Sequence, residues 1–249
     1  MYHDGIYEVA AAEAWLARFN AKRDPEAPNA TFFHLFLWAC AHALHERPGL
    51  NRFIMNGRVY QRNAVQLSFT AKRGFHDDEP IVTRKFTFEK NEPFAACVGR
   101  LSGTVTRARA GERDHADKEV ALVTRLPGFV LDLALAILKW LDRHNLLPKA
   151  MIEPDPMYAS LFVANLGSLG LDRVTHHMYE YGTISLFGTV GKIGPRWVAA
   201  DNGELVVKRT VEVRWSFDDR INDGFYCAAS LRAVADVIEN PEGMLGSPD

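Results

Sequence analysis

The sequence predicts an α/β protein whose strands form a mixed or antiparallel sheet, and three patterns lead to this fold class. Residues 65–72 alternate apolar and polar side chains, as a half-buried strand does. Asn56-Gly57 separates two short apolar runs and favours a β-hairpin turn, because both central positions of such a turn need positive φ. Residues 32–44 are apolar almost all round, which is typical of a helix inside a fold.

The first third of the chain predicts a strand and two helices. The strand covers residues 6–9, and Ala-rich residues 10–23 predict a helix that ends before a proline. The second helix is capped by Asn29 or Thr31 and runs to about residue 47. It carries three histidines with no acidic or cysteine partner at ligand spacing, so we expect ordinary hydrogen-bonded roles for His34, His42 and His45.

The middle of the chain predicts a strand over residues 81–89, a helix that opens at Pro93, and a polar surface loop over residues 107–118. Residues 129–145 predict a helix with only a thin charged stripe, so we expect it in the core or at a subunit interface. Its charges exclude a membrane span, which needs about 20 largely uncharged residues. An interfacial membrane helix would show a broader basic face.

The last third is mostly sheet. A turn at residues 201–203 precedes a long amphipathic strand over residues 205–217, in which apolar and polar side chains alternate. The other predicted elements are strands over residues 160–164 and 182–192 and a helix over residues 225–239.

Charge and cysteine usage exclude several function classes. The chain has 29 basic and 31 acidic residues among 249, which argues against a nucleic-acid surface. The widely spaced Cys40, Cys97 and Cys227 predict neither a disulfide framework nor a zinc site and suit a reducing compartment. The N-terminus does not read as a secretory signal, so we expect a single cytoplasmic domain over residues 1–249.

Residues 216–224, Ser-Phe-Asp-Asp-Arg-Ile-Asn-Asp-Gly, lie between the long strand and the last helix. This stretch resembles the S-x-D-H-R-x-x-D-G signature of the catalytic domain of dihydrolipoamide acyltransferases from 2-oxo acid dehydrogenase complexes, and more loosely the H-H-x-x-x-D-G segment of chloramphenicol acetyltransferase. In that family the histidine is the general base that takes a proton from a thiol or hydroxyl. Its position here holds Asp219.

Three further stretches resemble the same family in the same order along the chain. They are Ala43-Leu44 with Pro48-Gly49-Leu50-Asn51, Ala164-Asn165-Leu166-Gly167 with Gly170, and Glu239-Asn240-Pro241 with Met244-Leu245. The resemblance implies a two-layer α/β sandwich with a large mixed sheet, the chloramphenicol acetyltransferase-like fold of CoA-dependent acyltransferases. It also implies a homotrimer or a multiple of trimers, with a channel between subunits that admits coenzyme A or acyl-CoA as substrate, and no covalently bound cofactor. Because the resemblance uses nearly the whole chain, we expect no lipoyl or peripheral subunit-binding domain.

The chain departs from the family at two matched positions. The histidine is replaced by Asp219, and the serine that hydrogen-bonds the oxyanion of the tetrahedral intermediate is replaced by Ala164. An ordinary Asp is a weaker base than a His by about 2.6 pKa units, or about 3.5 kcal/mol. Strand parity predicts that Asp219 lies on the apolar side with Trp215 and Phe217, and Arg220 would oppose a raised pKa if it pairs with Asp219. Asp219 and Asp223 are candidate catalytic residues. The resemblance places Ala164 and Asn165 with the active-site turn and assigns the shaping of that turn to Ser216, Asp218, Arg220, Asp223 and Gly224.

The sequence gives weaker support to other candidate catalytic or binding residues. His176 or His177 could supply a relocated base, although a backbone-bonded pair is the simpler interpretation. Asp218-Asp219 with Asp223 does not predict a metal site, because adjacent carboxylates on a strand point to opposite faces. Residues 188–192 are only a fragment of a phosphate loop. Two hypotheses stay open: an acyltransferase with an unusual base, and a non-catalytic trimeric scaffold or binding protein.

Overall fold

The computed structural model describes residues 1–72, 81–109, 127–200 and 202–248. Within this part of the chain, seven strands form one sheet in the order β1-β9-β7-β6-β4-β5, with β8 paired to β9. A separate hairpin joins β2 and β3. The strands are β1 (Tyr2–Glu8), β2 (Arg52–Met55), β3 (Arg58–Gln61), β4 (Val65–Lys72), β5 (Ile81–Phe88), β6 (Leu161–Asn165), β7 (Leu186–Val190), β8 (Gly194–Ala199) and β9 (Leu205–Phe217).

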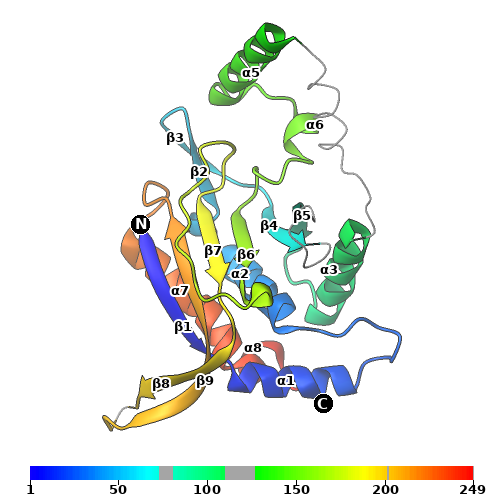
Figure 1. Ribbon diagram of the computed structural model, residues 1–249, viewed down its shortest axis with the longest axis vertical. Coiled ribbons are helices and arrows are strands. Elements are labelled where there is room, and N and C mark those ends of the chain that lie inside the picture. The colour runs from blue at the N-terminus through cyan, green and yellow to red at the C-terminus, as the bar shows by residue number, and fades with distance from the viewer. Residues whose placement is uncertain (73–80, 110–126, 201, 249) are drawn as a thin grey trace.

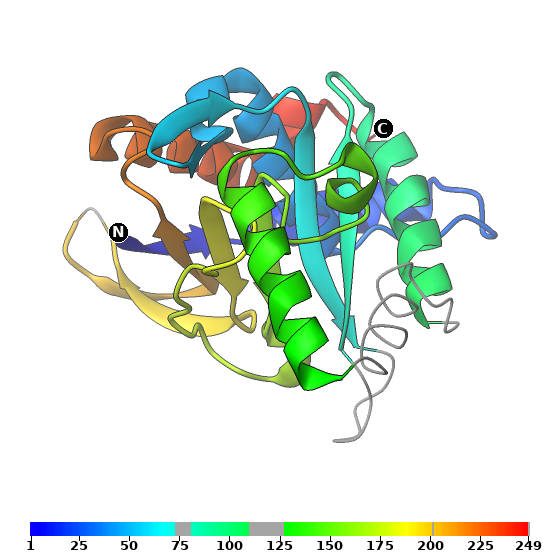
Figure 2. The same cartoon turned by 90° about the horizontal axis from the view of Figure 1, so that it is seen from above.

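The sheet is mixed, as the sequence predicted. Strands β4, β6 and β7 run parallel at its centre, whereas the other pairings are antiparallel. Helices lie against one face of this sheet (Figures 1 and 2). They are α1 (Ala10–Ala21), α2 (Phe32–Glu46), α3 (Phe94–Arg109), α7 (Gly224–Glu239) and α8 (Pro241–Leu245). The two-layer α/β class is therefore confirmed.

Local patterns placed most of these elements correctly. Helix α2 begins after Thr31, whose hydroxyl accepts a hydrogen bond from the His34 backbone while the His34 ring accepts one from Thr31 N–H. Asn56 and Gly57 have φ of 48° and 72°, as the predicted hairpin turn requires. Strand β9 directs Val211, Val213, Trp215 and Phe217 into the core, whereas Leu205 and Val207 at its start are exposed.

The opposite face of the sheet carries a second, smaller apolar cluster. Phe162 on β6 and Phe187 on β7 form its centre, with Ala159 and Ile184. Met178 and Tyr179, from the segment between the short 3₁₀ turn η2 (Gly167–Leu169) and β7, pack against it. This segment therefore covers part of the face opposite α2 and α7.

Helix α5 (Gly128–Arg143) differs from its predicted environment. No residue of α5 is buried, so it is not a core helix of the single chain. Phe129, Leu133, Ile137 and Trp140 form an exposed apolar stripe, while Tyr158 donates a hydrogen bond to Asp142 at 2.6 Å. In Figure 1, α5 and the short α6 (Lys149–Ile152) lie at the end of the molecule far from α1.

Some predictions were incomplete. Strand β1 starts at Tyr2 rather than at residue 6, and β8 was not predicted. The predicted loop over residues 107–118 lies outside the described residues from residue 110 on, and the predicted turn includes residue 201, which is not described either. Within the described ranges, no helix is long and apolar enough to span a membrane.

Candidate active site

The signature turn begins where β9 stops pairing. The last ladder pair is Phe217 with Leu186, after which Asp218 N–H donates to the Ser185 carbonyl at 3.0 Å. Asp219 lies beyond this contact and is exposed. The prediction that strand parity places Asp219 on the apolar side was wrong, because the strand ends before the residue whose parity was counted.

Asp218 and Arg220 form the charge pair of the turn. Arg220 donates to Asp218 through its backbone N–H at 3.1 Å, through Nε at 2.7 Å and through Nη2 at 2.5 Å. Burial alone would raise the pKa of Asp218, but these hydrogen bonds and the charge of Arg220 hold that pKa below its ordinary value. Arg220 is thus committed to Asp218 rather than to Asp219.

Asp223 is a structural cap. Its carboxylate accepts a hydrogen bond from Tyr226 N–H at 2.7 Å, and its φ of −72° and ψ of 164° are those of an N-cap residue. Gly224 is then the first residue of α7. Both positions set the start of α7 and so position the turn that holds Asp219.

Strand β6 ends with Ala164 and Asn165, and a second turn follows it. Asn165 Oδ1 accepts from Ser168 N–H at 3.3 Å, and its carbonyl accepts from the Ser168 hydroxyl at 2.9 Å. A Cβ on Gly167 would lie 2.6 Å from the Gly191 carbonyl oxygen, so only glycine fits there. Gly170 has a φ of 73°. Steric crowding therefore explains the glycine at position 167, and a positive φ explains the glycine at position 170.

The two departures from the family lie far apart in one chain. Ala164 is in register with Thr189 on β7, which is in register with Arg214 on β9. From Arg214 to the end of β9 the chain advances about 10 Å, and the two strand spacings add about 10 Å across the sheet, so Ala164 and Asp219 are separated by about 14 Å or more. Both positions cannot act on the same reacting atom within one chain.

The hydroxyl nearest to Ala164 in the register does not replace the missing serine. Thr189 Oγ1 donates to the Val174 carbonyl at 2.6 Å and is buried. This hydrogen bond holds the segment between η2 and β7 on the sheet. We conclude that no oxyanion donor is supplied from this position.

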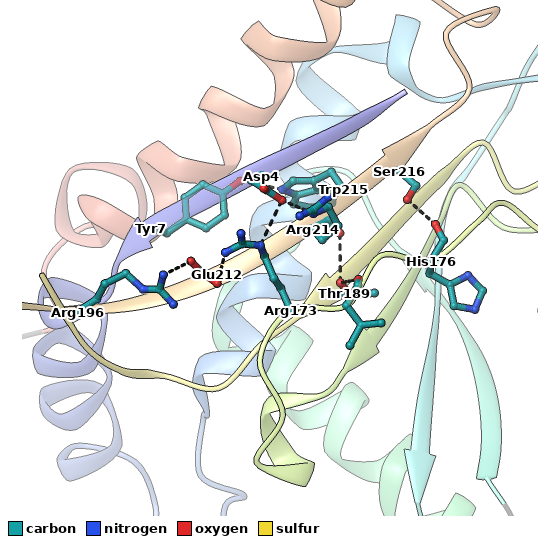
Figure 3. Close-up of polar contacts among 11 residues, drawn as sticks. Asp4, Tyr7, Arg173, His176, Thr189, Arg196, Glu212, Arg214, Trp215 and Ser216 are labelled. Carbon is teal, nitrogen blue, oxygen red and sulfur yellow. Dashed lines mark hydrogen bonds and ion pairs between the residues drawn. The ribbon is translucent and has the colours of Figure 1, made fainter. Parts of the chain in front are cut away.

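His176 lies on the same face of the sheet as Ala164. Its ring stacks on Phe187 with centroids 4.2 Å apart, and both Ala164 and Phe187 belong to the smaller apolar cluster or its margin. Nδ1 is 2.6 Å from the His177 carbonyl, a contact that only a protonated Nδ1 can make, which leaves the lone pair on Nε2. Ser216 fixes this arrangement, since its hydroxyl donates to the His176 carbonyl at 2.6 Å (Figure 3).

His177 extends the ring stack toward solvent. Its ring lies 5.0 Å from that of His176, and its side chain is exposed. The structure thus brings His176, Ser216 and Ala164 onto one face of the sheet and leaves Asp219 at one end. Sequence reasoning assigned Ser216 to the turn, whereas the hydroxyl holds the His176 segment.

An ion network beside Thr189 was not predicted. Arg173 and Arg196 both pair with the buried carboxylate of Glu212, and Arg173 and Arg214 both pair with Asp4 (Figure 3). The alternation in β9 predicted that its even-numbered polar side chains share one face of the sheet, but nothing in the sequence identified the partners of these side chains.

Nucleophilic cysteine chemistry is disfavoured. Cys40, Cys97 and Cys227 are buried free thiols, and burial raises the pKa of each one. In the part of the chain that the structure describes, no group of three His, Cys, Asp or Glu side chains is arranged to hold a metal ion.

Comparison with known proteins defines the class of this fold. The structure aligns with dihydrolipoamide acetyltransferase of Azotobacter vinelandii at a TM-score of 0.68 and 14% identity, covering 98% of this chain and 83% of that one. It aligns with a chloramphenicol acetyltransferase at a TM-score of 0.52 and 12% identity, covering 96% and 87% of the two chains. The protein therefore has a chloramphenicol acetyltransferase-like fold.

Part of the sequence matches a known family. Residues 149–246 match the 2-oxoacid dehydrogenases acyltransferase (catalytic domain) family, which confirms the resemblance over that stretch. The chain is 33% identical over 116 residues to the dihydrolipoyllysine-residue acetyltransferase component 4 of the chloroplastic pyruvate dehydrogenase complex of Arabidopsis thaliana. That alignment covers 46% of this chain and only 24% of the Arabidopsis protein.

Proposed function

We propose that this protein is a binding member of the acyltransferase fold that does not carry out the family's histidine-based acyl transfer. The observation that carries this proposal is the pair of matched replacements, a methyl group at Ala164 and an exposed carboxylate at Asp219. Its ligand would be an acyl thioester such as acyl-CoA, by analogy with the family. The free, buried cysteines suit a cytoplasmic location.

The residues that shape the two turns are retained, which favours a retained binding role over loss of the whole site. Asp218–Arg220 and the Asp223 cap still fix the signature turn, and Asn165 still fixes the turn after β6. A removed base costs transfer activity, because general base catalysis contributes about 10²–10⁴-fold. It need not cost ligand binding, which depends on the shape of the channel walls.

Self-association is part of this proposal. A site that uses positions 164 and 219 together needs two copies of the chain, since about 14 Å or more separates them in one copy. The exposed stripe on α5 is the kind of apolar surface that subunit contacts cover. A homotrimer, the state implied by the resemblance, would satisfy both features.

A second candidate function is acyl transfer with a relocated base. It is favoured by His176, whose Nδ1 contact leaves Nε2 as an acceptor on the same sheet face as Ala164. In this alternative, Nε2 would take the proton of a thiol or hydroxyl acceptor. The two candidates differ in whether the wild-type protein turns over.

Free-thiol release separates these candidates. Wild type is mixed with acetyl-CoA or longer acyl-CoAs and dihydrolipoamide, while acyl-CoA binding is followed by calorimetry. We expect binding without thiol release above the uncatalysed rate. Turnover that Asp219→Ala abolishes would overturn the proposal, whereas turnover lost in His176→Gln but kept in His177→Gln would establish the second candidate.

A further inference from the structure

Arg62, between β3 and β4, is a largely desolvated cation with no carboxylate partner among the described residues. Its Nη2 donates to the Thr183 carbonyl and to Thr183 Oγ1 at 2.9 Å, and its guanidinium carbon lies 4.5 Å from the centroid of the Phe53 ring. Nε is buried and makes no hydrogen bond. Burial lowers the pKa of Arg62 to about 9. A buried guanidinium without an anion is costly, and anionic ligands remove that cost.

Lys85 on β5 is a second cation in the same region. Its Nζ donates to the carbonyls of Ile152 at 2.9 Å and Tyr158 at 3.3 Å. Burial, together with the nearby charge of Arg62, lowers the pKa of Lys85 to about 8, against the opposing charges of Asp155 and Glu153. Hydrogen bonds connect the two cations, because Thr183, which accepts from Arg62, donates its N–H to the Met157 carbonyl at 3.0 Å, one residue before Tyr158, whose carbonyl accepts from Lys85.

Asp155 and Glu153 are close enough to oppose the lowering of the Lys85 pKa, but among the described residues neither carboxylate forms an ion pair with Lys85 or Arg62. Asp155 Oδ1 accepts from Met157 N–H at 2.8 Å, and Oδ2 accepts from the Tyr181 hydroxyl at 2.6 Å. Its carboxylate is thus committed to the turn before β6. Both Arg62 and Lys85 keep part of their side chains exposed, so a small anion can reach them.

The position of Arg62 connects it with the signature turn. Thr183, its partner, lies two residues before Ser185, whose carbonyl accepts from Asp218 N–H. The hydroxyl of Ser185 in turn donates to the Arg52 carbonyl at the start of the β2–β3 hairpin. The guanidinium of Arg62 therefore binds the segment before β7, which contacts the end of the sheet where Asp219 is found.

We propose that Arg62 and Lys85 form an oxyanion-binding site for a phosphate or carboxylate group of the protein's ligand. This inference rests on the proposed binding function and adds the charge that its ligand must carry. An oxyanion at this place would accept hydrogen bonds from the guanidinium and ammonium groups. Arg62, stacked on Phe53, supplies the planar donor and Lys85 the point charge.

Calorimetric titration with inorganic phosphate, and separately with acetate, tests the site. We expect one saturable site for at least one of the two anions, and which of them binds more tightly distinguishes a phosphate from a carboxylate ligand. Arg62→Gln should weaken binding by at least about tenfold, and Lys85→Met should also weaken it. Arg58→Gln, which removes an exposed cation from the same hairpin, is the matched control and should leave binding unchanged.

Three results would overturn the proposal: neither anion binds, Arg62→Gln binds as wild type does, or Arg58→Gln weakens binding as much as Arg62→Gln. If Arg62→Gln fails to fold, Lys85→Met against Arg58→Gln decides the question. The readout is independent of thiol release, so wild-type turnover would overturn the proposed function without affecting the oxyanion site.

Discussion

Asp219 and Asp223 lie four residues apart in the same turn but have different structural roles. Asp223 accepts the Tyr226 N–H and starts α7, whereas Asp219 is exposed and no hydrogen bond to it is found among the described residues. The family resemblance marks both positions, and the structure shows that one caps a helix while the other is exposed.

Replacing these aspartates should have unequal effects on stability. Asp223→Ala removes an N-cap and should lower the free energy of unfolding by about 1 kcal/mol, while Asp219→Ala should change it by less than about 0.5 kcal/mol. Urea denaturation of the two variants measures this difference. Equal losses would mean that Asp219 also supports the turn.

Lys85 predicts a pH dependence of stability. Its folded-state pKa of about 8 is below the ordinary value of 10.5, so the unfolded chain binds more protons between these limits. Its contribution to stability therefore becomes more favourable as pH rises through that window. Urea midpoints at pH 7.5 and 9.5 should rise more in wild type than in Lys85→Met; the same rise in both proteins would contradict the lowered pKa.

At the scale of elements, sequence patterns predicted what depends on near neighbours. Helix α2 followed from its Thr31 cap and apolar run, and β9 followed from strict alternation. Strand β8 was missed because Pro195 and the exposed, outward residues around it do not alternate as a half-buried strand does. The exposure of Asp219 was missed because the end of β9 depends on its pairing with β7.

The candidate site was predictable only in part, because sequence patterns report contacts between residues that are near one another along the chain. The motifs around Asn165 and Asp223 have local causes and were found. The contact between Ser216 and His176 joins residues 40 positions apart, and the partners of Glu212 come from two separate segments. No local pattern encodes contacts of this kind.

The ion network predicts how firmly the segment after η2 is held to the sheet. Glu212→Gln leaves Arg173 and Arg196 without their buried carboxylate and should lower the free energy of unfolding by about 2–4 kcal/mol. Glu204→Gln, at an exposed position before β9, is the matched control and should change it by less than about 0.5 kcal/mol. Chemical denaturation of both variants checks the prediction, and a loss in Glu212→Gln no larger than in the control would refute it.

At the scale of the whole molecule, the exposed stripe of α5 and the separation of positions 164 and 219 are the two features that the proposed assembly would explain. Sedimentation should therefore give wild type a mass that is a multiple of 27.9 kDa. Ile137→Glu places a charge in the apolar stripe and should shift the protein toward smaller species, whereas Lys139→Glu on the charged stripe should not. A wild-type monomer at micromolar concentration would contradict the assembly.

The central claim is that the chain keeps the residues that shape the family's active-site turn but lacks the general-base histidine and the oxyanion-binding serine. The most direct measurement is free-thiol release from acetyl-CoA with dihydrolipoamide by wild type and by the double variant Asp219→His/Ala164→Ser. Because a general base and an oxyanion donor each contribute at least about 10²-fold in established enzymes, we expect the double variant to exceed wild type by at least about tenfold. An active wild type that the double variant does not surpass would contradict the claim.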